Sequence, residues 1–428
     1  MQRVFVLSPD KEPLMPCHPA RARILLNKKR AKVFRVYPFT IILTKKTTNN
    51  VQPIEIKFDP GSRITGIALV GSFEQGKVAL FGANLEHKGL QVKQSLDSRR
   101  GIRRGRRNRN CRYRPARFNN RRKLKDWLPP SLMSRIGNVE TWMRRLSSYC
   151  PITSICVETV RFDMQLIVNP EITGAEYQQG TLAGYELREY LLEKWQRKCA
   201  YCGAVDIPLQ IEHIHPKSKG GSNRASNLTL ACEKCNQAKG NMPVEVFLKD
   251  EPAILKKILS QAKAPLRDAA AVNATRYAIG NMLKAFNLPV SFWSGGRTKL
   301  NRISQGYEKD HWIDAVCVGE TGENVLIHAP SVPTSIKAMG RGSRQMCRVD
   351  RFGFPRTGPK TVKTVKGFQT GDIVRATVTK GKKIGIYSGR VAIRKSGSFD
   401  IKTASKTVQG IGWKYCNLIQ KTDGYTYG

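Results

Sequence analysis

Two Cys-x2-Cys motifs place the strongest constraint on the fold of this chain: Cys199 with Cys202, and Cys232 with Cys235. Each short loop brings two sulfurs to one side of a metal ion, and four thiolates in two such pairs match a tetrahedral structural zinc site. The segment from the first pair to just beyond the second spans about 45 residues, which is too few to fold on an apolar core alone. The spacing therefore predicts a small domain held together by Zn²⁺.

The residues between the two pairs resemble the HNH (ββα-metal) nucleases, because Glu212-His213 comes before Pro216 and Asn236 follows directly after the last cysteine. The resemblance implies that His213 deprotonates a water and that Glu212 and Asn236 hold one Mg²⁺ on the scissile phosphate. A neutral imidazole suits a general base near pH 7, and oxygen ligands suit Mg²⁺.

Two further residues of this segment have weaker assignments. By the same resemblance Asn227 orients the base, and His215 is expected to play a supporting role by contacting phosphate or by packing. The alternative for the whole segment is a zinc ribbon that only binds. A ribbon does not require the Glu-His pair or the final asparagine.

Three carboxylates elsewhere in the chain form a second candidate centre. Asp59 ends an alternating strand over 54–59, Glu158 ends a buried strand over 152–158, and Asp314 lies three residues after His311 at the start of a helix. A turn aspartate is the alternative for Asp59 alone. Carboxylates on two strands and a helix are the pattern that clamps two Mg²⁺ ions for phosphodiester hydrolysis. The trio resembles the three segments of a split RuvC nuclease with a ribonuclease H-like fold, in which His311 assists Asp314.

Charge identifies the expected partner. The 428 residues include 74 Lys and Arg against 32 Asp and Glu, a formal net charge of +42. Such an excess favours a polyanion, and we expect a nucleic acid. A membrane surface is the alternative polyanion, but no apolar run approaches the roughly 18 residues of a spanning helix. Eleven cysteines without a disulfide pattern fit a reducing cytoplasm.

The basic residues are densest from Arg99 to Lys125, where no acidic residue interrupts the run. Because arginine's planar fork favours phosphate, we expect a helix that lies along a nucleic-acid backbone rather than a solvated charged surface. Three residues of a later glycine-rich loop, Arg297, Lys299 and Arg302, are weaker candidates for phosphate contacts, and solvated loop charges are the alternative. The candidate arginines of the run are Arg99, Arg100, Arg103, Arg104, Arg106, Arg107, Arg109, Arg112, Arg114, Arg117, Arg121 and Arg122.

The remaining segments supply context. The first fifty residues predict a small basic module, with a strand at 4–7, a proline-bounded loop around Pro13-Leu-Met-Pro16, a basic helix and strands at 32–36 and 40–43. Residues 251–288 predict helices that serve as scaffold of the carboxylate domain. Short strands at 373–378, 383–387, 390–393 and 399–401 predict a β-barrel-like module.

The order of these parts over essentially the full chain resembles IscB, a family of transposon-encoded, RNA-guided nucleases related to the ancestor of the large CRISPR effectors. Its motifs include Ser294-Gly-Gly-Arg-Thr-Lys299 and Gln178-Gln-Gly-Thr-Leu-Ala-Gly-Tyr185, and no candidate catalytic position departs from the family pattern. The expected fold class is α/β multidomain. The resemblance implies a PLMP domain over 1–52, RuvC segments over 53–95, 129–192 and 249–335, an arginine-rich bridge helix over 96–128, an HNH domain over 193–248 and a C-terminal β-rich domain over 336–428 that reads the target-adjacent motif.

The resemblance also implies a function. The expected protein is a monomer in a ribonucleoprotein of the prokaryotic cytoplasm, bound to a long guide RNA (omega RNA). It would cut double-stranded DNA beside a short motif, the HNH centre cutting the guide-paired strand and the RuvC centre the displaced strand, with Mg²⁺ in both centres. The alternatives are an unguided nuclease, such as a junction resolvase or homing-type enzyme, and a non-cleaving guide-RNA binder.

Overall fold

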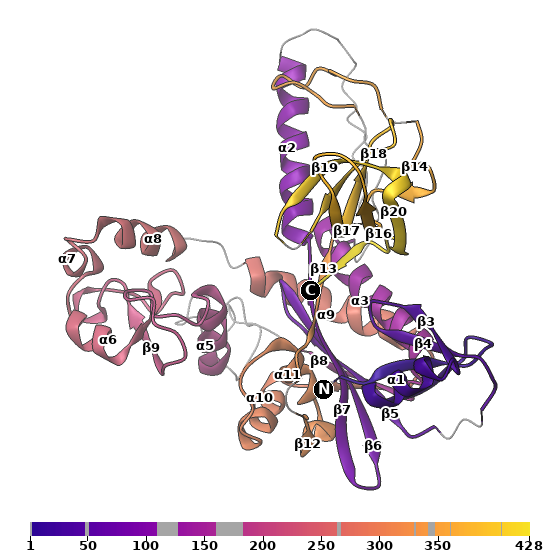
Figure 1. The fold of residues 1–428 in the computed structure, drawn as a ribbon. Helices are drawn as coiled ribbons and strands as arrows, with labels where there is room; N and C mark the ends of the chain where they lie inside the picture. Colours follow the sequence, from indigo (N-terminus) through magenta and orange to yellow (C-terminus); the bar gives the residue numbers. More distant parts are fainter. Residues whose placement is uncertain are drawn as a thin grey trace. The chain divides into compact units, whose positions relative to one another are not determined.

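The computed structural model describes residues 2–47, 51–108, 127–159, 183–262, 267–328, 331–340, 347–359, 361–403 and 405–428. The chain divides into two compact units, residues 1–159 together with 278–428, and residues 160–277 (Figure 1). The second unit is thus inserted into the first, as expected for an inserted nuclease domain. Among the described helices, none combines the length and the apolar character needed to cross a membrane.

The first unit is built on a sheet with the strand order β11-β8-β5-β6-β7-β13-β21, to which β12 adds by pairing with β7. Strands β5, β6 and β7 run antiparallel, whereas β8 is parallel to β5 and β11 is parallel to β8. The bounds are β5 Ile54–Pro60, β6 Ile64–Phe73, β7 Gly76–Glu86, β8 Ser154–Glu158, β11 Val290–Trp293, β12 Val325–Leu326, β13 Thr334–Ala338 and β21 Tyr425–Tyr427.

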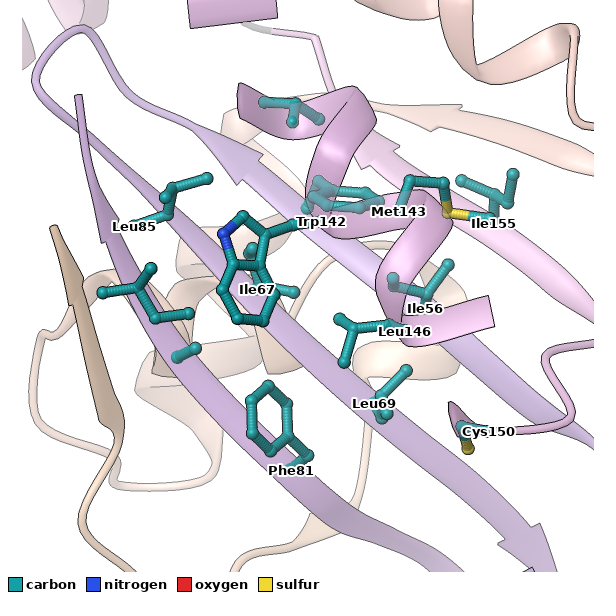
Figure 2. Close-up of a cluster of buried hydrophobic side chains, with 14 of the residues drawn as sticks. Ile56, Ile67, Leu69, Phe81, Leu85, Trp142, Met143, Leu146, Cys150 and Ile155 are labelled. Atoms are coloured by element: carbon teal, nitrogen blue, oxygen red, sulfur yellow. The ribbon is translucent and has the colours of Figure 1, made fainter. Parts of the chain in front are cut away.

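One face of this sheet is covered by helix α3, Pro130–Tyr149. Its buried residues Trp142, Met143 and Leu146 pack on strand residues including Ile56 and Phe81 in the largest apolar core of the described chain (Figure 2). Because side chains alternate along β5, Ile56 and its apolar neighbours face α3 while the intervening polar residues face the other side. Full burial of each such large side chain stabilises the fold by about 1.5–3 kcal/mol.

The opposite face of the same strands is covered by a short helix, α11, His311–Val316. Trp312 packs there with Ala68 and Val70 of β6. A Cβ atom at Gly66 would lie 1.8 Å from the His311 carbonyl oxygen, and one at Gly82 would lie 2.3 Å from the Trp312 ring. Glycine at these two strand positions therefore lets α11 lie directly against the sheet.

The N-terminal module is a four-stranded sheet in the order β2-β1-β4-β3 with helix α1. The sequence predicts a loop around Pro13, but these residues form the edge strand β2, Pro13–Cys17. An edge position tolerates proline because one side of the strand needs no hydrogen-bond donors. The other bounds are β1 Val4–Leu7, α1 Pro19–Asn27, β3 Ala31–Arg35 and β4 Thr40–Leu43.

The C-terminal region contains the expected β-rich module, a five-stranded antiparallel sheet in the order β19-β18-β17-β16-β20 (yellow in Figure 1). A single strand, β17, replaces the two predicted over 383–393. The bounds are β14 Thr364–Val365, β15 Phe368–Gln369, β16 Ile373–Val378, β17 Gly385–Ile393, β18 Ser398–Lys402, β19 Thr407–Gly412, η4 Trp413–Tyr415 and β20 Cys416–Gln420.

The chain does not end in this module, because its last strand, β21, returns to the central sheet beside β13. Asp423, just before β21, is paired with Arg35 of the N-terminal module and with Arg145 of α3. Tyr427 donates a hydrogen bond to the same carboxylate and its ring stacks on Tyr37. This cluster ties together three segments that are far apart in the sequence.

The second unit contains the two-stranded sheet of β9 and β10 and the helices around it. Helices α5 and α8 pack on this sheet, so residues 252–262 belong to the inserted unit. The sequence instead predicts them as scaffold of the carboxylate domain. Helicity is readable from apolar spacing, but the packing partner is not. The bounds are α5 Ala183–Lys194, β9 Leu209–His213, η2 Lys217–Lys219, β10 Leu228–Cys232, α6 Glu233–Lys239, α7 Val244–Phe247 and α8 Pro252–Ala262, while α9, Arg267–Lys284, crosses the boundary between the units.

Candidate active sites

The four cysteines come together as the spacing predicts. The sulfur atoms of Cys199, Cys202, Cys232 and Cys235 all lie within 4.8 Å of one another, and Cys202 Sγ lies 3.8 Å from Cys232 Sγ. Tetrahedral zinc with Zn–S bonds of about 2.3 Å places sulfur atoms about 3.8 Å apart. The cluster therefore fits a four-thiolate metal such as zinc.

The peptide around Cys199 also favours its thiolate. Burial opposes ionisation, but backbone N–H groups of Tyr201, Cys202 and Cys232 outweigh it and lower the pKa of Cys199 to about 7. A thiolate is the form that binds a metal. The second pair straddles the start of helix α6, because Cys232 is its N-cap residue and Cys235 lies in its first turn.

The ββα arrangement of β9, β10 and α6 positions His213 at the end of the first strand. The imidazole Nε2 lies 2.9 Å from Oδ1 of Asn223, in the loop between the strands. A neutral imidazole that donates its Nε2 proton to this oxygen carries its lone pair on Nδ1. The contact thus selects the tautomer that a general base needs.

Asn227 has a different role from the one predicted for it. Its amide side chain bridges the backbone of His215, accepting from the N–H and donating to the C=O, and it also donates to the Ser222 carbonyl. It therefore fixes the loop after β9, and Asn223 is the residue that contacts His213. His215 Nε2 lies 2.9 Å from the Lys219 carbonyl oxygen, which agrees with a supporting role.

Glu212 is buried on the face of β9 opposite to His213, because successive strand residues alternate. Its Oε2 accepts from the Tyr201 hydroxyl at 2.9 Å, and its Oε1 pairs with Nζ of the fully buried Lys239 at 2.8 Å. Asn236 lies on α6 and donates to Gln210, which shares the face of Glu212. Metal binding by Glu212 requires an oxygen to exchange one of these partners, and the ligand role of Glu212 and Asn236 remains a prediction.

The carboxylate residues of the first unit meet at one edge of the central sheet. Phe58 pairs with Val157 in the parallel β5 and β8 strands, so the next residues, Asp59 and Glu158, lie at neighbouring positions near the carboxyl ends of these strands. His311, at the start of α11, places Nδ1 3.4 Å from Asp59 Oδ2. The structure thus brings together residues that the sequence distributes over three segments.

The acidic groups at this edge of the sheet influence each other's pKa. Burial and the neighbouring Asp59 carboxylate raise the pKa of Asp314 to about 6, against the opposing effect of Lys309, Arg302 and His311. The same two causes raise the pKa of Glu158, while a hydrogen bond from Thr298 opposes them. A nearby cation would relieve such mutual repulsion among buried carboxylates, so this edge of the sheet is a candidate cation site.

Protein cations occupy part of this site. Arg302 Nε lies 2.8 Å from Asp314 Oδ1, and Lys309 Nζ lies 3.9 Å from Oδ2. Within the described residues, the cysteine cluster alone groups three or more potential ligands closely enough to share an ion. The all-oxygen donor set of Asp59, Glu158 and Asp314 nevertheless has the chemistry that Mg²⁺ prefers.

The arginine-rich run lies partly on α2, Gly89–Asn108, which begins well before the predicted helix and packs against α3. Arg99, Arg100, Arg103, Arg104 and Arg107 are all exposed on it. The side chain of Arg106, together with Arg109, Arg112, Arg114, Arg117, Arg121 and Arg122, lies outside the part of the chain that is described. The exposed guanidinium groups are available to a polyanion, as predicted.

The predicted phosphate contacts of the glycine-rich loop lie on helix α10, Gly295–Ser304, which follows β11. Arg297 is paired with Glu323, so a phosphate contact would require it to exchange this partner. Lys299 is half-buried on the same helix. These phosphate contacts remain predictions.

Sequence analysis missed several residues that shape the two sites. Lys239, Tyr201 and Asn223 hold the residues of the ββα module, and Lys57 lies at the carboxylate edge. Only Lys57 left a usable signal. It is a lysine at an interior position of the predicted strand that leads to Asp59.

Comparison with known proteins adds an independent line of evidence. Residues 199–242 match the family described as HNH endonuclease. This segment is therefore similar to HNH endonuclease domains, which supports the prediction of an endonuclease. Residues 4–180 match the family described as RRXRR protein, and the chain reads Arg-Arg-Gly-Arg-Arg at 103–107.

Two curated relatives are both named CRISPR-associated endonuclease Cas9. The protein from Corynebacterium diphtheriae is 38% identical over 56 residues, and that from Actinomyces naeslundii is 42% identical over 52 residues. These matches cover 12% and 11% of this chain and 5% of each relative. The similarity to these relatives therefore concerns a short segment of proteins that are much longer than the match.

Solved Cas9 structures also resemble the chain, but weakly. The Type II-C Cas9 of Actinomyces naeslundii has a TM-score of 0.18 at 18% identity, covering 44% of this chain and 32% of that one. Streptococcus thermophilus Cas9 in complex with the GGAA PAM has a TM-score of 0.20 at 13% identity, covering 61% and 32%. Superpositions with such low TM-scores do not support an assignment of fold or function to this chain.

Proposed function

We propose that this protein is an RNA-guided DNA endonuclease with two metal-dependent centres, an HNH centre that cuts the guide-paired strand and a RuvC-type centre that cuts the displaced strand. The observation that carries the proposal is the match of residues 199–242 to HNH endonucleases, and two proteins similar to short segments of the chain are named CRISPR-associated endonuclease Cas9. The matched segment is inserted into a second unit that presents its own set of carboxylates. The IscB family is the member of this class that the order of parts resembles most.

In the HNH centre, His213 accepts a proton from the attacking water through Nδ1 while Asn223 holds the imidazole by Nε2. Glu212 and Asn236 are the residues that would hold a divalent ion, which supplies charge stabilisation at the scissile phosphate when bound. The four cysteines would hold Zn²⁺ and thereby fix α6, the helix of Asn236, beside β9 and β10.

In the second centre, Asp59, Glu158 and Asp314 would hold Mg²⁺, and His311 stands beside Asp59 to take or give a proton. The sheet supports a ribonuclease H-like assignment, since three antiparallel strands are followed by two parallel ones in the order β7-β6-β5-β8-β11. The first two carboxylates lie near the carboxyl ends of its adjacent parallel strands. Two centres with separate geometries suit strands of opposite polarity.

The proposal that an RNA guides this protein rests on the net charge of the chain and on its exposed arginines. A net charge of +42 in 428 residues, with exposed arginines along α2, exceeds what a small DNA site requires and suits a large structured RNA. Recognition of the target sequence would then be delegated to base pairing. The β16–β20 sheet is the candidate reader of the target-adjacent motif.

The decisive experiment is to express the chain with its native flanking DNA and to sequence the RNA that co-purifies with it. We expect one abundant species with a structured part and a variable segment, which then directs cleavage of a matching duplex. A smear of host RNA, or none, would instead favour the unguided nuclease, and branched DNA junctions would be the next substrate.

The carboxylate centre should show a characteristic pH dependence. Because the pKa of Asp314 is raised to about 6 and that of Glu158 is raised as well, a proton competes with the metal for these groups at mildly acid pH. Above pH 6 Asp314 is ionised. Below it, we expect the Mg²⁺ concentration for half-maximal cutting of the displaced strand to rise at least about tenfold per pH unit.

The measurement is a Mg²⁺ titration of strand-specific cleavage between pH 5 and pH 8. Each reaction also reports cutting of the guide-paired strand, which controls for loss of folding or of guide binding. An Mg²⁺ requirement for the displaced strand that stays flat down to pH 5 would rule out these carboxylates as the metal ligands.

A further inference from the structure

Lys57 is a fully buried lysine on β5, the strand that also carries Asp59. Residues two apart on a strand share a face, so Lys57 lies on the side of Asp59 and of helix α11, opposite to the α3 core. Burying an ammonium group is costly unless its hydrogen bonds are replaced. The replacement here is specific.

The Lys57 ammonium binds the end of α11. Its Nζ donates to the carbonyl oxygen of Val318 at 2.8 Å and to that of Val316 at 3.3 Å, and it lies 3.5 Å from Glu55 Oε2. Carbonyl groups at a helix C-terminus have no intrahelical partner, and a positive charge there also interacts favourably with the helix dipole.

A second side chain completes this attachment. Asn301, buried on α10, donates to the carbonyl oxygens of Cys317 at 2.9 Å and Gly319 at 2.7 Å. Four successive carbonyl groups, from 316 to 319, are thus bound by Lys57 and Asn301. Glu55 in turn accepts from the Thr321 hydroxyl in the same segment.

Helix α11 needs such external support. It spans only His311–Val316, too short to be stable by itself. The backbone of its first residue rests on Gly66, and its exit is held by Lys57 and Asn301. The third carboxylate, Asp314, lies between these two attachments. Its position relative to Asp59 therefore depends on both.

We infer that Lys57 is a positioning residue of the carboxylate centre, which holds α11 so that Asp314 and His311 stand over Asp59. The inference rests on the proposed function of that centre. Lys57 touches neither substrate nor metal in this role. An apolar residue could fill the same space in the core, but it could not bind the two carbonyl groups.

The test compares Lys57→Met with Ile56→Ala in the full chain bound to its co-purified RNA. Met keeps the length and apolar stem of lysine without the donor, whereas Ile56 is the neighbouring, fully buried residue on the opposite face. Hydrogen exchange of the amides over 311–322 is measured without added metal. Strand-specific cleavage is then measured against Mg²⁺ concentration.

We expect Lys57→Met to speed exchange over 311–322 at least tenfold and to raise the Mg²⁺ needed for displaced-strand cutting about tenfold or more. Ile56→Ala should lower thermal stability at least as much without either effect. Lys57→Gln keeps one donor and should fall between the wild type and Lys57→Met. It also provides the test if Lys57→Met does not fold.

Unchanged hydrogen exchange over 311–322 in both Lys57→Gln and Lys57→Met overturns the inference. Faster exchange combined with a wild-type Mg²⁺ requirement for cutting also overturns it. Equal effects in Ile56→Ala would reduce Lys57 to a general contributor to stability and overturn it too. If the wild-type protein does not cut the displaced strand, the proposed function of the centre fails instead. In that case the positioning role in the catalytic reaction fails with it, while the exchange data still report whether Lys57 holds α11.

Discussion

Replacement of His213 by alanine is expected to leave a nickase that cuts only the displaced strand. Loss of a general base slows the reaction it serves by about 10²- to 10⁴-fold, and the second centre lies in a separate unit of the chain. The measurement is cleavage of a guide-matched duplex with a different label on each strand. His215→Ala is the matched control, because the side chain of this exposed histidine, two residues away, bonds to the Lys219 carbonyl in its own loop, and we expect both strands to be cut.

The reciprocal change, Asp59→Ala, should leave cutting of the guide-paired strand and abolish that of the displaced strand. Asp59 lies next to the last residue of β5 in the first unit, beside His311 and the neighbouring carboxylates. If either single substitution abolishes both cuts, the chain does not contain two independent centres. If each substitution abolishes cutting of the strand that we expect it to leave cut, the strand assignment is reversed.

The features that sequence analysis predicted correctly depend on short separations along the chain. The two cysteine pairs each close a loop of four residues, so their spacing alone indicates a shared metal, and the four sulfurs do meet. The alternation over Ile54–Pro60 correctly indicates a strand with one apolar face. Local geometry links residue types to structure directly in such cases.

Contacts across long separations left no such signal. Lys57 binds a carbonyl group 259 residues away, and Arg302 reaches Asp314 from a different helix. The return of β21 to the central sheet is likewise invisible in residues 425–427, which read as any short strand. Each of these depends on how the folded elements pack, and apolar spacing reports only that an element has an apolar face.

The misassigned asparagine illustrates a limit of resemblance at a single position. Asn227 and Asn223 lie in the same loop and offer the same amide group, so residue type does not distinguish them. The folded loop does distinguish them. Asn227 bonds to both the N–H and the C=O group of His215, whereas Asn223 contacts the His213 imidazole. The motif therefore names a candidate base, while only the folded loop shows that Asn223 is the asparagine in contact with it.

Loss of zinc is expected to silence the HNH centre selectively, and Cys232→Ser is the sharpest way to produce it. Cys232 caps α6, the helix that also carries Cys235, Asn236 and Lys239, the buried partner of Glu212. Structural zinc contributes about 10–16 kcal/mol in zinc-finger peptides, which is comparable with the entire stability of a small domain. The variant should lack zinc and cut the guide-paired strand at least about 100-fold more slowly.

The apolar core between α5, β10 and α8 argues for a local rather than a complete loss of structure. Trp195, Leu191, Leu230 and Ile258 pack there and extend the core well beyond the cysteines, so we expect faster hydrogen exchange in α6 and little change in α5 and α8. Cys347→Ser, at an exposed cysteine outside the cluster, is the control and should keep both zinc and activity. Displaced-strand cutting should persist in both variants. A zinc-free Cys232→Ser protein that cuts both strands normally would mean that the cluster has no part in holding Asn236 and Glu212 in place.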